Sequence, residues 1–252
     1  MKNKGKNLLI TLAVLALWLS VWELAALKVG NAYLLPDVGR TFKALFKILS
    51  KSKFYLALFS TLLRVLTGFL VSIIIGTVLA FFSYRYSFVY KIFSPVISVM
   101  KSTPVASFAL LLWVALSGNA HTVAISFLMV MPVIFQNVYD GFKSINRELS
   151  ELCDVFEFSL KKRLKLLILP SVFAYFIPAV ITGISFAWKA GIAAEIIGYT
   201  VNSIGEWIND SRQNYDTASI FALTLVIIVL SVALEKLVKF LLSKARERSL
   251  YI

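Results

Sequence analysis

Long hydrophobic stretches recur along the whole chain and are separated by shorter polar segments. A helix needs about 20 mostly apolar residues to cross a lipid bilayer. Stretches of about that length or more lie at residues 8–27, 55–82, 88–116, 121–139, 168–199 and 217–242. The pattern predicts an all-α fold class, a polytopic membrane bundle of about six transmembrane helices. We assign the whole chain, residues 1–252, to a single transmembrane domain.

The segment at residues 37–50 has a different pattern. Its apolar residues recur three or four positions apart, as on one face of a helix, and cations lie between them. It is too short and too charged to span a bilayer, so we predict a helix that lies on the membrane surface. The apolar positions are Val38, Phe42, Leu45, Phe46 and Leu49, and the cations are Arg40, Lys43 and Lys47.

A proline interrupts the third hydrophobic stretch. Pro104 has no backbone N–H and clashes with the preceding helical turn, so the helix over residues 88–116 is expected to break near this position. Lys101, Ser102 and Thr103 come directly before it. Non-helical backbone at membrane depth is tolerated where it is buried in protein or lines a water-filled cavity. We therefore expect these three residues to line a cavity.

Four ionisable residues fall within apparent spans: Arg64, Lys101, Lys189 and Glu195. Charges at membrane depth are costly, so such residues face a partner or a wet pathway. Arg64 and Glu195 lie toward the outer half, where each is expected to snorkel or to form a structural pair. Lys101 and Lys189 lie deeper. Two roles stay open for them: lining a pathway, or bonding the carbonyl groups freed at the Pro104 break.

Small residues recur four positions apart in two of the predicted spans. Such stripes let helices approach closely in lipid, so they indicate a compact bundle and no particular chemistry. One stripe consists of Gly68, Ser72, Gly76 and Ala80; the other consists of Gly183, Ala187 and Gly191, with Ala190, Ala194 and Gly198 beside it.

Composition agrees with a membrane protein. The chain is 59% hydrophobic, with a mean hydropathy of +0.83, whereas soluble domains are about 45–50% apolar. A net charge of +13 is expected from membrane topology, and no basic soluble face indicates nucleic-acid binding. The single cysteine, Cys153, excludes an internal disulfide, and with His121 as the only histidine we expect no metal site and no cofactor.

Counting cations on alternate sides of the spans gives the orientation. With the N-terminus inside, the inner side holds sixteen Lys and Arg and the outer side seven, which favours both termini in the cytoplasm. The basic start is followed by an apolar stretch too long for a signal peptide, so an uncleaved first helix is expected. The inner set is Lys2, Lys4, Lys6, Arg85, Lys91, Lys143, Arg147, Lys161, Lys162, Arg163, Lys165, Lys236, Lys239, Lys244, Arg246 and Arg248; the outer set is Lys28, Arg40, Lys43, Lys47, Lys51, Lys53 and Arg212.

Residues 140–167 form the only long, strongly charged insertion between spans. Glu151 stands sixteen residues before Leu167, which begins the run Leu167-Ile168-Leu169-Pro170. This spacing resembles the cytoplasmic loop of permease subunits of binding-protein-dependent ABC importers: Glu-Ala-Ala, three residues, Gly, nine residues, then Ile-x-Leu-Pro.

Three positions depart from the pattern of that loop. Leu152 and Cys153 replace the alanines, and Glu157 replaces the glycine. A glycine there allows a positive φ, which would cost Glu about 1 kcal/mol, so we expect a turn of different shape. Ser159 is placed to cap a second short helix.

The resemblance covers nearly the whole chain from Leu35 and is strongest to the nitrate/sulfonate/taurine branch of these permeases. The matching segments are Leu35-Pro36, residues 61–69, Gly76, Pro95, residues 101–106, Trp113, Ala187-Trp188-Lys189, residues 194–198 and Asp216-Thr217.

The resemblance implies the membrane-spanning subunit of an importer in the bacterial inner membrane. It implies a cytoplasmic ATPase dimer that grips the loop, an external substrate-binding protein and a second permease copy, most simply a homodimer. No G-x-x-x-x-G-K sequence is present, so we expect no P-loop ATP binding and no catalytic residues. The coupling-loop residues implied are Glu151, Leu152, Cys153, Glu157, Leu167, Leu169 and Pro170. The predicted path residues are Lys101, Ser102, Thr103, Lys189 and Glu195.

Two other functions remain open from the residues alone. An ion-coupled secondary transporter or a channel would use the intramembrane charges as relays or filters. However, no second broken helix appears, and the chain is short for an inverted repeat. A membrane sensor or scaffold would transport nothing. A cationic lining at Lys101 and Lys189 suits a small anion, whereas lysines of purely structural role would suit a neutral or cationic vitamin precursor.

Overall fold

The structure, a computed structural model, describes residues 2–116 and 119–250, and all regular elements in these ranges are helices. This confirms the predicted fold class. In chain order the elements are α1 (Lys2–Val29), α2 (Val38–Leu49), α3 (Ser52–Arg85), α4 (Ser87–Ser102), α5 (Val105–Ala115), α6 (Ala120–Lys143), α7 (Arg147–Val155), α8 (Leu160–Arg163), the π-helix η1 (Leu164–Ile168), α9 (Leu169–Ile197), α10 (Ile204–Gln213) and α11 (Thr217–Leu250).

Five helices in the described ranges are long and apolar enough to cross a membrane. They are α1, α3, α6, α11 and the continuous run from α8 through α9. The pair α4 and α5 would make a sixth crossing if counted together, although it is bent by 105°. The bend lies at Pro104, as the sequence predicts: Thr103 is extended (ψ 128°), because a residue before proline disfavours the helical conformation.

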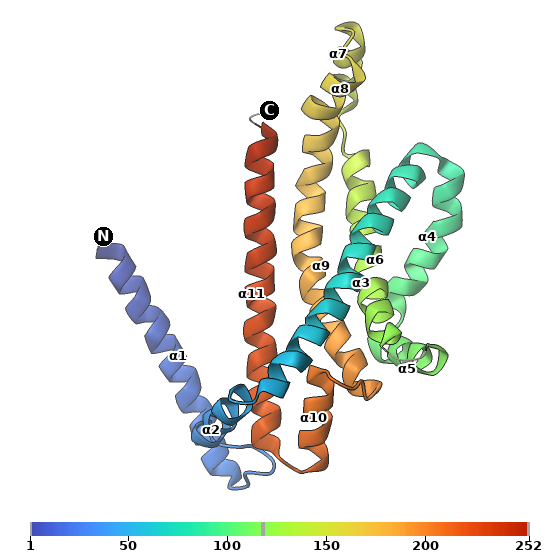
Figure 1. Cartoon of the computed structure of the whole chain (residues 1–252). Coiled ribbons are helices and arrows are strands. Elements are labelled where there is room, and N and C mark those ends of the chain that lie inside the picture. The colour runs from blue at the N-terminus through green and yellow to red at the C-terminus, as the bar shows by residue number, and fades with distance from the viewer. Residues whose placement is uncertain (1, 117–118, 251–252) are drawn as a thin grey trace.

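Helices α3, α6 and α9 form the centre of the bundle (Figure 1). Helices α4 and α5 lie on one flank, and α11 and α1 on the other. The short helices α7 and α8 project from one end of the molecule, whereas α2 and α10 lie at the opposite end. The N-terminal end of α1 and the C-terminal end of α11 are both directed toward the α7 end. Both chain ends and the charged loop therefore share one side of the bundle.

The two stripes of small residues pack the centre. A Cβ on Gly68 would lie 2.4 Å from the Val123 carbonyl oxygen, and one on Gly191 would lie 2.5 Å from a methyl group of Val65. Ser72 Oγ donates hydrogen bonds to the Gly68 and Phe127 carbonyls at 2.7 and 3.1 Å. The close approach of α3 and α9 to each other and to α6 thus depends on the absence of larger side chains.

Helix α1 contacts the bundle mainly near its C-terminal end. Trp22 Nε1 donates to the Pro36 carbonyl at 3.0 Å, and Glu23 accepts from the Val38 N–H at 2.9 Å. Asp37 caps α2 by accepting from the Arg40 N–H at 2.7 Å. These bonds satisfy the backbone donors at the start of α2 and join it to α1.

The polar segment at residues 202–216 contains helix α10, which the sequence analysis did not predict. Ser203 caps it, with its hydroxyl accepting from the Glu206 N–H at 2.9 Å, while Glu206 accepts from the Asn202 N–H at 2.6 Å. The Ser-x-x-Glu spacing is the signature of such a reciprocal cap. Asn209 Nδ2 donates to the Ile196 carbonyl at 2.8 Å, so α10 is tied onto the end of α9.

Candidate functional site

Helix α7 presents an apolar surface at the tip of the molecule. Asn146 caps it by accepting from the Leu149 N–H at 3.1 Å, and Glu151 pairs with Arg147 one turn earlier at 2.9 Å. Large hydrophobic side chains on α7 and just after it are exposed, most of all Val155 at the end of α7 and Leu160 at the start of α8. An exposed cluster of this kind marks an interaction surface. Its members are Leu149, Leu152, Val155, Phe156 and Leu160.

The turn after α7 keeps the left-handed conformation despite its departure from glycine. Glu157 has φ +48°. The Phe158 N–H donates to the Cys153 carbonyl at 2.9 Å, and the Glu157 N–H donates to the Asp154 carbonyl at 3.1 Å, which is the Schellman arrangement of a helix end. The expectation of a differently shaped turn was wrong, because these two bonds fix the chain path whichever residue stands there. Ser159 caps α8 as predicted, accepting from the Lys162 N–H.

Glu157→Gly is therefore expected to stabilise the α7 end by about 1 kcal/mol, since glycine removes the left-handed strain without changing a hydrogen bond. Hydrogen exchange of the α7 amides measures the change: protection should increase about fivefold. Glu148→Gly, inside the same helix, is the matched control and should lower protection, because glycine disfavours helix interiors. Unchanged or lower protection in Glu157→Gly would contradict the assigned turn.

The loop is fixed to the bundle at its second half. Arg163 pairs with Asp154 at 2.6 Å and also donates to the Ser150 hydroxyl, so α8 is bound to α7. Leu167 and Cys153 are buried, whereas Leu169 and Pro170 begin α9 and are exposed. Leu167 lies in η1, the π-helical segment that joins α8 to α9 within their continuous helical run. Such segments often mark functional sites.

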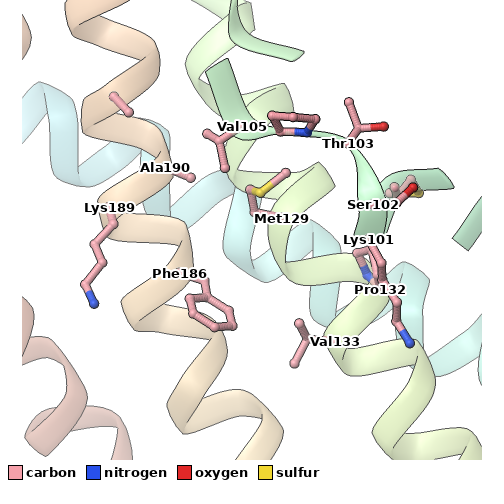
Figure 2. A pocket seen from close by; sticks show the side chains of 13 residues that line it. Lys101, Ser102, Thr103, Val105, Met129, Pro132, Val133, Phe186, Lys189 and Ala190 are labelled. Atoms are coloured by element: carbon pink, nitrogen blue, oxygen red, sulfur yellow. The ribbon is translucent and has the colours of Figure 1, made fainter. Parts of the chain in front are cut away.

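A separate cavity of about 610 Å³ lies between α4, α5, α6 and α9. Figure 2 shows the α4–α5 break on one side of it and α9 on the other, with α6 between. Most of its wall is apolar, and its charged lining residues are two lysines, with no Asp or Glu among them. The lining consists of Met100, Lys101, Ser102, Thr103, Pro104, Val105, Met129, Pro132, Val133, Phe186, Lys189, Ala190 and Ala193.

The structure brings four of the five predicted path residues to this cavity: Lys101, Ser102, Thr103 and Lys189. Lys101 Nζ donates to Gln136 Oε1 at 3.1 Å, and the Gln136 amide in turn donates to Asp140 at 3.0 Å. Lys189 is exposed, and the described residues give it no hydrogen bond or ion pair. Figure 2 places the two lysines at opposite edges of the cavity.

Two hydroxyls at the end of α4 bond the Val99 carbonyl in addition to its own helical hydrogen bond. The Val99 carbonyl accepts from Thr103 N–H and Thr103 Oγ1 at 3.0 and 2.8 Å, and from Ser102 Oγ at 3.1 Å. Ser102 and Thr103 therefore stabilise the end of α4. Lys101 bonds Gln136, and among the described residues neither lysine bonds a carbonyl group at the break.

Glu195 lies apart from the cavity. Its side chain is fully buried and pairs with Arg64 at 3.1 Å, so the two form the structural pair that the sequence left open. Thr61 Oγ1 donates to Glu195 at 2.9 Å and accepts from the Ile204 N–H at 3.0 Å. The Gly205 N–H donates to Glu195 at 3.4 Å. Arg64 also donates to the carbonyls at residues 201 and 202 at 3.3 Å.

Sequence reasoning missed the partners Thr61 and Gly205. The structure shows why residue 205 is a glycine: a Cβ there would lie 2.5 Å from the Glu195 Cβ. Within residues 2–116 and 119–250, no three His, Cys, Asp or Glu side chains lie close enough to hold a metal ion.

Comparison with known proteins gives the family. The chain is 28% identical over 255 residues to the formylaminopyrimidine transport permease protein ThiX of Halalkalibacterium halodurans, covering 96% of this chain and 98% of that protein. It is 25% identical over 244 residues to the putative aliphatic sulfonates transport permease protein SsuC of Bacillus subtilis, covering 94% and 84%. A crystal structure of an amino acid ABC transporter with histidines shares the fold, with a TM-score of 0.61, 16% identity and coverage of 81% of this chain and 97% of that one.

Residues 72–247, more than half of the chain, match the family described as the binding-protein-dependent transport system inner membrane component. The matched region contains the projecting loop, the cavity and the α4–α5 break. The chain therefore belongs to this family and is the permease component of an ATP-binding cassette transport system.

Proposed function

We propose that this permease forms the translocation path for a small anionic solute, delivered by an external binding protein, and works as a homodimer. The observation that carries the proposal is the cavity of about 610 Å³ whose charged lining residues are Lys101 and Lys189. Because ATP hydrolysis in these systems belongs to a separate subunit, the energy must reach this path through a contact with that subunit.

The 140–167 loop is proposed as that contact. It carries Glu151 and the exposed apolar cluster on α7, and its second half continues through η1 into α9. Helix α9 also lines the cavity through Phe186, Lys189 and Ala190. When a pair of ATPase subunits closes on nucleotide, it would draw the two loops of a homodimer together. Each α9 would carry that displacement to the cavity.

The orientation follows from the same assignment. If the loop meets a cytoplasmic ATPase, the ends of α1 and α11 that are directed toward α7 (Figure 1) are cytoplasmic too. The excess of Lys and Arg on that side supports this orientation. Helices α2 and α10 would then face the external binding protein.

The charge of the solute is inferred from the lysines. A cation at membrane depth needs a partner or a wet pathway, and Lys189 has neither hydrogen bond nor ion pair among the described groups. An anionic group on the solute would supply the missing partner. The similarity to a sulfonate permease is consistent with an anion, whereas the similarity to a formylaminopyrimidine permease gives the competing substrate class.

Lys189→Gln is expected to lower ATP-driven uptake of an alkanesulfonate by at least about tenfold, since a charge-assisted bond contributes roughly twice a neutral one. Uptake is measured in proteoliposomes that contain the assembled transporter and its binding protein. Lys101→Gln should have a smaller effect, because the Lys101 ammonium group already donates a hydrogen bond to Gln136.

Lys53→Gln, an exposed lysine outside the cavity, is the matched control and should transport normally. If the assembled transporter imports a formylaminopyrimidine and ignores sulfonates, the anion proposal fails while the permease assignment stands. Normal sulfonate uptake by Lys189→Gln would also refute a role for this lysine.

A further inference from the structure

A second cavity lies at the foot of the 140–167 loop, at the opposite end of the bundle from α10. Its volume is about 340 Å³, and its wall is mostly aromatic and aliphatic. It is formed where α3 and α6 end and where η1 leads into α9. The lining residues are Thr77, Phe81, Tyr84, Phe142, Ile145, Ser150, Arg163, Leu164, Leu167, Ile168, Leu169, Val172, Phe173 and Phe176.

This cavity opens on the outer surface of the bundle. Phe81, Tyr84, Leu164 and Leu169 line it, and each is 42–48% exposed. The Tyr84 and Phe142 rings are stacked, with their centroids 5.2 Å apart, so this wall is aromatic. In the inner wall, Thr77 Oγ1 is buried and has no hydrogen-bond partner among the described residues.

A run of four cations in the sequence includes Arg163, which is the one charged residue among the described residues that line the cavity. Lys161, Lys162, Arg163 and Lys165 fill four of the five positions 161–165, directly before the membrane helix. Arg163 itself lines the cavity, and its ion-pair partner Asp154 is 64% exposed. An anion arriving at the rim could therefore replace Asp154 as the partner of Arg163.

We propose that this cavity binds an anionic phospholipid, with an acyl chain against the aromatic wall and the phosphate at this run of cations. Clusters of Lys and Arg next to a membrane helix attract anionic head groups, and the bilayer supplies this ligand at high concentration. The apolar wall and the run of cations match the two parts of such a lipid. Since Leu164, Leu167 and Ile168 of η1 form part of the wall, a bound lipid would support the segment that joins the loop to α9.

Native mass spectrometry of the purified chain tests the site, with dioleoylphosphatidylglycerol as the anionic probe and dioleoylphosphatidylcholine as the zwitterionic one. The wild type should retain the anionic lipid preferentially. Lys161→Gln/Lys165→Gln should weaken its retention about 30-fold, since each interfacial cation contributes on the order of fivefold. Lys236→Gln/Lys239→Gln, which removes two exposed cations from α11, is the matched control and should leave retention unchanged.

A second pair of variants tests the apolar half. Thr77→Phe fills the cavity and removes a hydroxyl that has no partner, so it should abolish retention, whereas Thr77→Val keeps the volume and should retain the lipid. The proposal is overturned if both lipids bind equally to the wild type, or if the α11 control weakens binding as much as the loop variant. It is also overturned if Thr77→Phe changes the number of chains per complex and not the lipid count, because a second protein copy would then cover the cavity.

Discussion

Arg64→Met is expected to lower the free energy of unfolding by about 3–5 kcal/mol, because removal of one partner leaves a buried charge uncompensated. The Glu195 side chain has no exposed surface and Arg64 is its only ion-pair partner in the described chain. The loss also leaves the carbonyls of Val201 and Asn202 without the guanidinium that bonds them. At about 2–4 °C per kcal/mol for a chain of this size, thermal unfolding in detergent should shift downward by about 6–20 °C.

The double variant Arg64→Met/Glu195→Leu distinguishes the cost of an unpaired buried charge from the cost of altered side-chain packing. It should recover most of the lost stability, since an apolar pair of similar volume often replaces a buried ion pair at little cost. Arg40→Met is the matched control: its pair with Asp37 is surface-exposed, and exposed pairs contribute little. If Arg64→Met unfolds within about 2 °C of the wild type, the pair does not hold α3 and α9 to the start of α10.

Glu151→Arg is expected to abolish coupling to the ATPase while leaving the chain folded. Glu151 is exposed, at the centre of the α7 surface, and its only ion-pair partner in the described chain is Arg147 on the same helix. Reversing a charge in a protein interface costs about 2–5 kcal/mol, so binding to the ATPase should weaken at least about 30-fold. Co-purification of the ATPase and uptake in proteoliposomes measure the loss.

Glu148→Arg makes the same charge change on the same helix, outside the motif, and is the matched control. It should keep co-purification and uptake near wild type. Retained co-purification and retained uptake in Glu151→Arg would exclude this residue from the contact. A loss in both variants would indicate that the total charge of the loop matters and not the position of Glu151.

The amphipathic and interrupted segments were predictable because they depend on local chemistry. Hydrophobic length fixed the spans, Pro104 fixed the break, and Asp37 and Ser159 stand at the helix starts that their side chains cap. The Ser203-x-x-Glu206 spacing is a signal for the start of helix α10, but the polar composition of this segment gives no hydrophobic pattern that predicts a helix. A short polar helix that packs on another helix does not show the hydrophobicity of a span.

The site was only partly predictable. The spacing from Glu151 to Pro170 identified the loop. Four of the predicted path residues do line the cavity: Lys101, Ser102, Thr103 and Lys189. Glu195 was grouped with them because intramembrane charges favour a wet pathway. The tertiary structure instead pairs it with Arg64, 131 positions away in the sequence. Such a distant pairing leaves no periodic signal in the sequence.

The sequence alone determined that this chain is a helical membrane protein, where its spans lie and where one breaks, because bilayer thickness and proline geometry act on each segment separately. The tertiary structure decided which charges meet. It pairs the Glu195 carboxylate with Arg64, and it gives Lys101 a hydrogen bond to Gln136. The structure leaves Lys189 at the edge of the cavity. It also decided that Glu157 takes a left-handed turn, since two backbone hydrogen bonds between α7 and the following residues outweigh the preference of one side chain.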